Sequence, residues 1–144
     1  MGYCMEQRGA DFFISKENFP KMIKAIHALV NEPDKMGGGS YSGGKTISKH
    51  YSWVDMSFCN ITDVEKIFQC WRWNVYFDDN NNITDISFDG EKMGDDRVLF
   101  DAIAPFVENN SFIEMRGEDT DMWRWKFVNG KCKEIGARII WDDD

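Results

Sequence analysis

The feature that most constrains the fold is a series of short segments in which apolar and polar residues alternate. Residues 73–77 form such a segment, and a turn over 78–82 separates it from a return segment over 83–88. Further along the chain, Asn129-Gly130 is a strong signal for a two-residue hairpin turn of type I′. Alternation with period two is typical of strands with one buried face. Successive hairpins therefore predict a mostly antiparallel sheet.

Three segments have the spacing of helices instead. Asn18 is a candidate cap for the first, whose apolar residues fall on one helical stripe: Phe19, Met22, Ile23, Ile26, Leu29 and Val30. Thr62 and Glu65 have the spacing of a capping box for a second helix. Asp95 or Asp96 caps the third, which runs toward Pro105.

Further strands are expected at 11–14, 51–58, 112–116, 122–128, 131–135 and 137–141. The order β-α-β-α-β-β-α-β-β-β predicts an α+β fold, with about three helices packed on one face of a sheet of hairpins. At 144 residues we expect a single domain over 1–144, with a flexible glycine-rich loop at 34–49 and an acidic end at 142–144.

The tripeptide Trp-Arg-Trp occurs twice, at 71–73 and at 123–125, and each copy begins or lies in an expected hairpin. This repetition indicates a possible internal duplication. It is equally consistent with two strands that bury alternate tryptophans. If both tryptophan pairs point inward, Arg72 and Arg124 lie on the opposite sheet face, where they would meet neighbouring acids or bind an anion.

Residues Gly39 to Thr46 match the phosphate-loop pattern G-x-x-x-x-G-K-[ST]. In that motif the glycines let backbone amides surround a phosphate, the lysine reaches its oxygens and the hydroxyl holds magnesium. The surrounding sequence is wrong for the motif, because no hydrophobic strand precedes it and no helical period follows. A glycine loop without a ligand is the leading interpretation. Binding of a nucleotide or phosphate ligand remains the alternative, with candidate residues Gly39, Tyr41, Gly44, Lys45, Thr46, Arg72 and Arg124.

No catalytic constellation can be assembled from the sequence. The four cysteines include no C-x-x-C pair, and neither His27 nor His50 lies near a cysteine. Asp78, Asn80 and Asn82 resemble the start of a calcium loop, but Ile83 stands where that loop requires glycine. We therefore expect no catalytic residue, no metal and no cofactor. The sequence favours a function other than catalysis, without excluding an enzyme.

Charge is distributed unevenly along the chain. Residues 1–72 carry 9 basic and 8 acidic side chains, whereas residues 73–144 carry 8 basic and 17 acidic ones. Such an acidic half argues against direct nucleic-acid binding and favours a protein partner, either basic or itself nucleic-acid-binding. Candidate partner-binding residues are Glu118, Asp119, Asp121 and Trp53. No apolar run is long enough for a signal peptide or a membrane span, so a cytoplasmic protein with reduced thiols is expected.

Several segments together resemble a group of small uncharacterised acidic proteins of bacterial and phage type. The similarity lies in residues 5–12, 51–55, 71–73, 90–107 and 113–125, and it covers most of the chain. The resemblance implies no activity and assigns no functional residue. It implies a context, because proteins of this kind are often carried on phages and mobile elements and often bind and block a host protein.

Together these observations predict a noncatalytic binding protein. The expected role is that of a phage or mobile-element inhibitor or anti-defence protein, which blocks or sequesters a host factor through an acidic, aromatic-rich surface. The alternative is a protein that sequesters a nucleotide or another phosphate ligand at Gly39 to Thr46. The sequence leaves the oligomeric state open.

Overall fold

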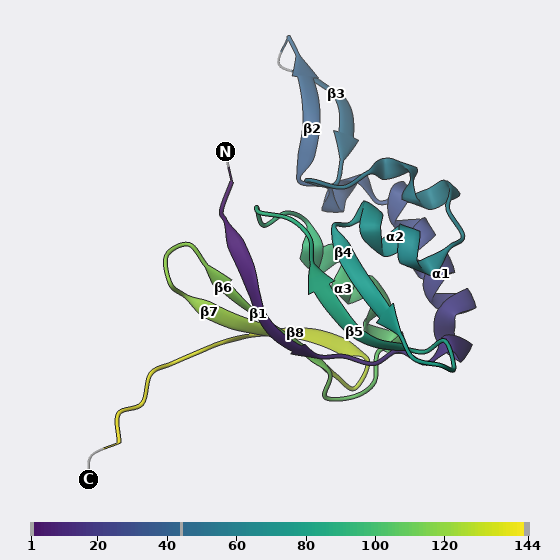
Figure 1. Cartoon of the computed structure of the whole chain (residues 1–144). Coiled ribbons are helices and arrows are strands. Elements are labelled where there is room, and N and C mark those ends of the chain that lie inside the picture. Colours follow the sequence, from purple (N-terminus) through teal and green to yellow (C-terminus); the bar gives the residue numbers. More distant parts are fainter. Residues whose placement is uncertain (1, 44, 143–144) are drawn as a thin grey trace.

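The computed structural model describes residues 2–43 and 45–142, without the side chains of 40–42 and 45–47. In this part of the chain, eight strands form antiparallel sheets and three α-helices accompany them (Figure 1). This confirms the predicted α+β fold built from hairpins. None of the helices in the described ranges is long and apolar enough to cross a membrane.

The main sheet has four antiparallel strands in the order β1-β6-β7-β8. Their bounds are Met5–Asp11, Phe112–Gly117, Met122–Val128 and Lys131–Gly136. In β7, Trp123, Trp125 and Phe127 are buried while the residues between them are more exposed, as the alternating sequence predicts. One face of this sheet therefore carries the core.

A second hairpin, of β4 (Trp73–Phe77) and β5 (Ile83–Phe88), lies beside β1. The Gln7 side chain joins them: its amide nitrogen donates to the Ile86 carbonyl at 2.9 Å, and its oxygen accepts from the Phe88 amide at 2.6 Å. Because a glutamine amide carries both a donor and an acceptor, it takes the place of a peptide group in the ladder. The hairpin thus continues the main sheet through a side chain.

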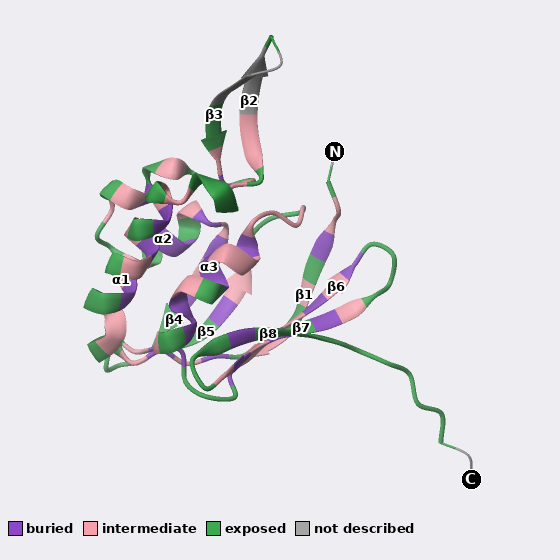
Figure 2. Cartoon of the chain, turned by 180° about the vertical axis from the view of Figure 1, so that it is seen from behind, coloured by how far each residue is buried: buried purple, intermediate pink, exposed green. Residues whose placement is uncertain are grey.

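The helices α1 (Phe19–His27), α2 (Val64–Cys70) and α3 (Asp96–Ile103) cover one side of these strands (Figure 1). Five 3-10 segments accompany them within the described residues: η1 (Lys16–Asn18), η2 (Ala28–Asn31), η3 (Pro33–Lys35), η4 (Met56–Asn60) and η5 (Ala104–Phe106). Buried residues occur on the sides of the helices and strands that face each other (Figure 2).

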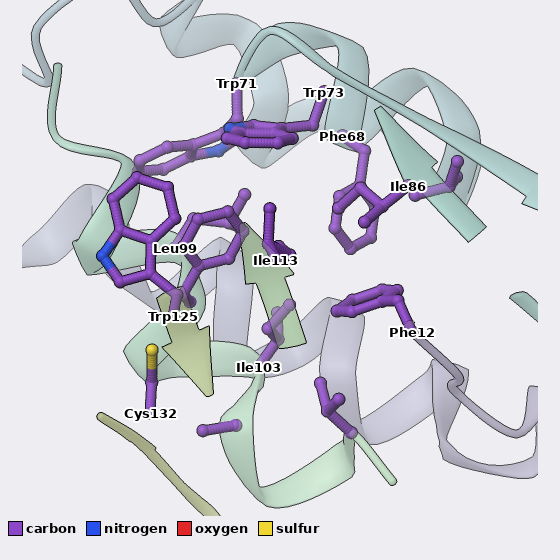
Figure 3. Packing of buried hydrophobic residues seen from close by; sticks show 14 of the residues in the cluster. Phe12, Phe68, Trp71, Trp73, Ile86, Leu99, Ile103, Ile113, Trp125 and Cys132 are labelled. Carbon is purple, nitrogen blue, oxygen red and sulfur yellow. The ribbon is translucent and has the colours of Figure 1, made fainter. Parts of the chain in front are cut away.

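Aromatic rings from both hairpin systems meet in the core (Figure 3). The ring of Trp73 in β4 lies 5.1 Å from that of Phe100 in α3, and Phe100 lies 5.0 Å from Trp125 in β7. Edge-to-face and tilted contacts of this kind stabilise a core beyond the area they bury. One continuous aromatic cluster therefore connects the second hairpin, a helix and the main sheet.

The prediction of a flexible glycine-rich loop over 34–49 was wrong. After η3, the chain forms a hairpin of β2 (Gly38–Ser42) and β3 (Lys45–His50) that projects from the body (Figure 1). The strands pair with each other through their backbones, which needs no apolar alternation. The usual sequence signal for strands is therefore absent.

The strand expected at 51–58 was also wrong. Tyr51 is fully buried and its hydroxyl donates to the Leu29 carbonyl at 2.7 Å, and the chain then turns into η4. The carboxylate of Asp55 accepts from the amide of Ser57 at 3.0 Å and so begins that helical turn. The hydrogen bond that caps η4 therefore outweighs the weak alternation of apolar and polar residues over 51–58.

Other boundaries shift by smaller amounts. Asp63 caps α2 by accepting from the Lys66 amide at 3.2 Å, so the predicted cap at Thr62 is displaced by one residue. The first strand begins at Met5, before the predicted 11–14. Ala137 donates one backbone hydrogen bond to Met122 in β7, whereas residues 138–141 are extended and have no strand partner within the described chain.

Candidate binding surface at the base of the glycine-rich hairpin

A buried ion pair lies directly after α2. Arg72 has a left-handed backbone with φ 68°, and its NH2 nitrogen lies 3.2 Å from Oδ2 of Asp96. Its NH1 nitrogen donates to the Lys92 carbonyl at 2.6 Å, and the guanidinium lies 5.1 Å from the centre of the Phe88 ring. The bonds and the aromatic contact together fix this arginine in one orientation.

Asp96 is the buried partner, with 2 % of its surface exposed. Its carboxylate also accepts from the Trp73 indole and from the Gly94 amide, both at 2.9 Å. Burial raises the pKa of Asp96, and the donated bonds and the charge of Arg72 oppose that rise. With its oxygens occupied by these donors, Asp96 acts as a structural anchor of the segment 89–96 rather than as an acid or base.

Trp53 stands beside this ion pair and is 52 % exposed. Its backbone is left-handed as well, with φ 65°. A Cβ added at Gly94 would lie 3.0 Å from both Trp53 Cδ1 and Arg72 NH2, so the indole packs closely on the loop that covers Arg72. Two residues other than glycine in a strained conformation, side by side, form a pattern often found at functional sites.

The neighbouring acid connects the projecting hairpin to the same place. Oδ2 of Asp95 accepts from the amide of Gly37 at 2.8 Å and from the amide of Ser52 at 2.7 Å. These bonds hold the base of the β2–β3 hairpin beside Trp53 and the start of α3. Both predicted carboxylates of the pair Asp95 and Asp96 therefore hold structure together.

The acidic turn between β6 and β7 connects to the same segment from the other side. Glu118 accepts from the amide of Cys4 at 2.7 Å, and Asp121 accepts from the hydroxyl of Tyr3. Tyr3 also accepts from the amide of Asp119 at 3.2 Å. Cys4 forms a bridge with Lys92, whose carbonyl binds Arg72. The segment 89–96 thus links the acidic turn to Trp53.

A cleft of about 630 Å³ opens between these elements. Its charged lining consists of three glutamates and one arginine: Glu6, Glu91, Glu118 and Arg116. Glu6 and Glu91 are exposed, and an excess of carboxylates in a concave surface attracts cationic groups. Sequence reasoning missed Glu6 and Glu91, because only the pairing of β1 with β6 and the Cys4–Lys92 bridge bring them to Glu118.

The phosphate-loop candidates lie in the projecting hairpin. Gly39 pairs with Lys49 and Tyr41 with Thr46, so the described backbone on either side of Gly44 is that of paired strands, whose amides do not converge on one point. Gly44 lies outside the described residues, as do the side chains of Tyr41, Lys45 and Thr46.

The two arginines do not form one anion site. Arg124 lies on the outer face of β7, where its Nε donates to Glu114 at 2.8 Å and its guanidinium lies 4.3 Å from the centre of the Phe112 ring. Arg72 is held by Asp96 behind the segment 89–96. Each guanidinium is therefore neutralised by its own carboxylate.

Within residues 2–43 and 45–142, no group of three or more histidine, cysteine or acidic side chains could hold a metal ion. Compared with known proteins, the chain matches no family model, no curated protein and no solved structure.

Proposed function

We propose that this protein is a noncatalytic binding module that receives a basic segment of a protein partner. The observation that carries the proposal is the acidic cleft lined by Glu6, Glu91 and Glu118. The exposed indole of Trp53 packs on Gly94 in the segment 89–96, which also supplies Glu91 to the cleft. Arginine and lysine side chains fit such a cleft by charge. A rigid tryptophan is a frequent centre of binding energy in protein interfaces.

The rigid support favours binding over chemistry. Asp95 and Asp96, which could serve as an acid–base pair, are both occupied by backbone amides and by the Arg72 and Trp73 side chains. The cleft and the indole are held by the same segment, so a partner would find its contacts already positioned. Such preorganisation lowers the entropic cost of association.

Blocking a partner is a natural consequence of this mode of binding. Basic surfaces of proteins commonly serve to contact anionic ligands such as nucleic acid, and a protein that occupies such a surface with carboxylates competes with those ligands. We therefore propose, as the sequence led us to expect, that the protein is an inhibitor or anti-defence protein of phage type that sequesters a host factor.

A labelled arginine-rich peptide provides a defined probe of the cleft. We expect the wild-type protein to bind it at low salt and to lose affinity steeply as salt rises. The double variant Glu6→Lys/Glu91→Lys should bind much more weakly. The matched control is Glu17→Lys/Glu65→Lys, which changes net charge by the same amount at two exposed glutamates outside the cleft lining. Equal losses in both double variants would show that only net charge matters and would refute the cleft as the site.

The role of Trp53 is tested on a captured partner. Immobilised wild-type protein and its Trp53→Ala variant are exposed to the same cell lysate at low salt, and the bound proteins are identified by mass spectrometry. Tyr76→Ala is the control, since Tyr76 is also an exposed aromatic residue, at 48 %. We expect basic proteins that are retained by wild type and by Tyr76→Ala but not by Trp53→Ala. Retention by all three baits would contradict an anchoring role for the indole.

The nucleotide alternative has a separate test. Lys45→Ala and wild type are compared in thermal-shift assays with nucleoside triphosphates and magnesium. A bound ligand in large excess raises stability by several kcal/mol at about a thousand times its Kd. Because the backbone of Gly39 to Thr46 forms a hairpin, we expect no shift in either protein. A shift in wild type that Lys45→Ala abolishes would restore the phosphate site.

A further inference from the structure

We infer that two copies of this chain pair through the free edge of β8 and the extended residues that follow it, forming a symmetric dimer with a continuous sheet. Strand β8 is the last strand of its sheet, and residues 137–142 continue from it as an extended segment that runs away from the body (Figure 1). An unpaired strand edge is a ready template for another strand.

The exposed side chains of this segment indicate that it is normally covered. Ile139, Ile140 and Trp141 are 80 %, 74 % and 82 % exposed, and Ile135 within β8 is 44 % exposed (Figure 2). These residue types are enriched in strands and in the buried parts of interfaces. A run of this kind left in water at a sheet edge is the pattern that natural proteins otherwise avoid.

The backbone of β8 offers the correct groups. The amide of Ala137 donates to Met122 in β7 at 3.0 Å, and antiparallel ladders alternate. Glu134 and Gly136 therefore direct their peptide groups away from β7, toward the open edge. The orientation is visible at Cys132, whose outward carbonyl accepts from Arg97 at 2.7 Å. That bond occupies the Cys132 carbonyl, so pairing begins at the outward groups of Glu134 and Gly136 and extends to residues 131–133 only if Arg97 releases that carbonyl.

Among twofold axes through the outward-directed residues Glu134, Gly136 and Arg138, charge favours one register. A twofold axis at Gly136 places Glu134 opposite Arg138 of the partner subunit, twice, and keeps outward-directed peptide groups facing each other. An axis at Glu134 would oppose two glutamates, and one at Arg138 would oppose two arginines. Opposite charges stabilise cross-strand pairs and like charges destabilise them. A Cβ at Gly136 would meet nothing within 4 Å in the single chain, so the face of the sheet at this position is uncovered.

In this register the apolar residues also find partners. Ile139 lies opposite Lys133 of the partner subunit, and Trp141 opposite the partner subunit's Lys131. The aliphatic part of a lysine side chain covers apolar surface while its ammonium group stays in water. The two lysines, which protect the edge of the single chain, thus become covers for the partner's isoleucine and tryptophan.

The test is a charge-exchange cycle followed by sedimentation equilibrium of the full chain over a wide range of concentrations. We expect a wild-type dimer. Arg138→Glu and Glu134→Arg should each raise the dimer Kd by about tenfold or more, because like charges then meet at both ends of the interface. The double variant Glu134→Arg/Arg138→Glu restores opposite charges and should restore the dimer.

Rescue separates this interface from damage to the fold. Glu134 also accepts from the Trp125 indole at 3.1 Å, so Glu134→Arg alone could disturb the monomer, whereas the double variant would not recover from such a disturbance. Gly136→Pro is an independent variant, since it removes an outward amide without touching the ladder to β7 and should give monomers. A dimer that survives Gly136→Pro, or a double variant that stays monomeric, would overturn the proposed register. A wild-type chain that is monomeric throughout would overturn the dimer and leave the edge to a strand of another protein.

Discussion

The two Trp-Arg-Trp segments carry the same side chains into two different environments. At 123–125 the tripeptide lies within β7, so both tryptophans are buried and Arg124 points out toward Glu114. At 71–73 the first tryptophan is the C-cap of α2 and only the second belongs to a strand. There the backbone of Arg72 turns left-handed and its guanidinium goes inward to Asp96.

The difference shows what determines the direction in which the arginine side chain points. Both tryptophan pairs are buried, because burial of large aromatic surface is favourable in either backbone conformation. The arginine, by contrast, follows the backbone between them. Regular strand geometry sends its side chain to the opposite face, whereas a helix end followed by a left-handed residue does not. The tripeptides therefore do not mark two equivalent structural units.

The largest expected effect concerns the acids that face the two arginines. Asp96→Ala leaves the Arg72 charge buried without a partner and should lower the free energy of unfolding by roughly 3–5 kcal/mol. Glu114→Ala, the matched change at the exposed pair, should cost less than about 1 kcal/mol. Urea unfolding of both variants measures the difference. The double variant Asp96→Ala/Arg72→Met should recover part of the loss, and similar costs for both single variants would contradict the contrast between the two sites.

A second difference between the two regions is expected at alkaline pH. Tyr51, 5.0 Å from the Trp71 ring, has its pKa raised by burial from 10.0 to about 12. The folded state therefore holds this proton more tightly than the unfolded state. The contribution is fully present below pH 10 and is lost as pH rises toward about 12. Two pKa units correspond to roughly 2–3 kcal/mol.

Cys132, which pairs with Phe127 near the second tripeptide, has its pKa raised by burial from 9.0 to about 12. The contribution of Cys132 to stability should therefore begin to fall about one pH unit below that of Tyr51. Denaturant unfolding between pH 8 and 12 tests both, since Tyr51→Phe should flatten the upper part of the curve and Cys132→Ala the lower part. An unchanged pH profile in Tyr51→Phe would show that the hydroxyl ionises equally in both states.

Conservative replacement of the arginines should give an intermediate effect. Arg72→Lys loses the bond to the Lys92 carbonyl and the contact with Phe88, and we expect a cost of about 1–3 kcal/mol. Arg124→Lys keeps its charge in water beside Glu114 and should change stability by about 0.5 kcal/mol or less. Thermal unfolding compares the two. A larger loss for Arg124→Lys would reverse the assignment of the structural arginine.

The smallest effect on stability is expected at Trp53, which shares the left-handed backbone of Arg72 but is exposed. Trp53→Gly relieves a conformation that costs about 1–2 kcal/mol, and it also frees the unfolded chain. We expect the free energy of unfolding to stay within about 1 kcal/mol of wild type, whereas binding of a protein partner falls sharply. A strong loss of stability would make Trp53 a core residue rather than an anchor.

The sequence predicted the elements with strong local signals. The hairpins 73–88 and 122–136 and the three helices were expected from alternation, turn residues and apolar stripes, and their presence is confirmed. The hairpin over 38–50 was missed, because its glycines and polar residues carry no alternation. Of the candidate site residues, the structure brings together Trp53, Arg72 and, through the segment 89–96, Glu118. Glu6 and Glu91, which complete the acidic cleft, had no local signal at all.

In the hairpins 73–88 and 122–136 and in the three helices, the sequence by itself determined which face would be buried and where the chain would turn, because these depend on the spacing of residues a few positions apart. Only the tertiary structure decided which charges meet. Arg72 contacts Asp96, which is 24 positions away in the sequence, and the amide of Cys4 donates to Glu118, which is 114 positions away. The sequences of β1 and of β6 say nothing about which strand lies next to which. The acidic cleft exists only because the packing of the whole core aligns their ends.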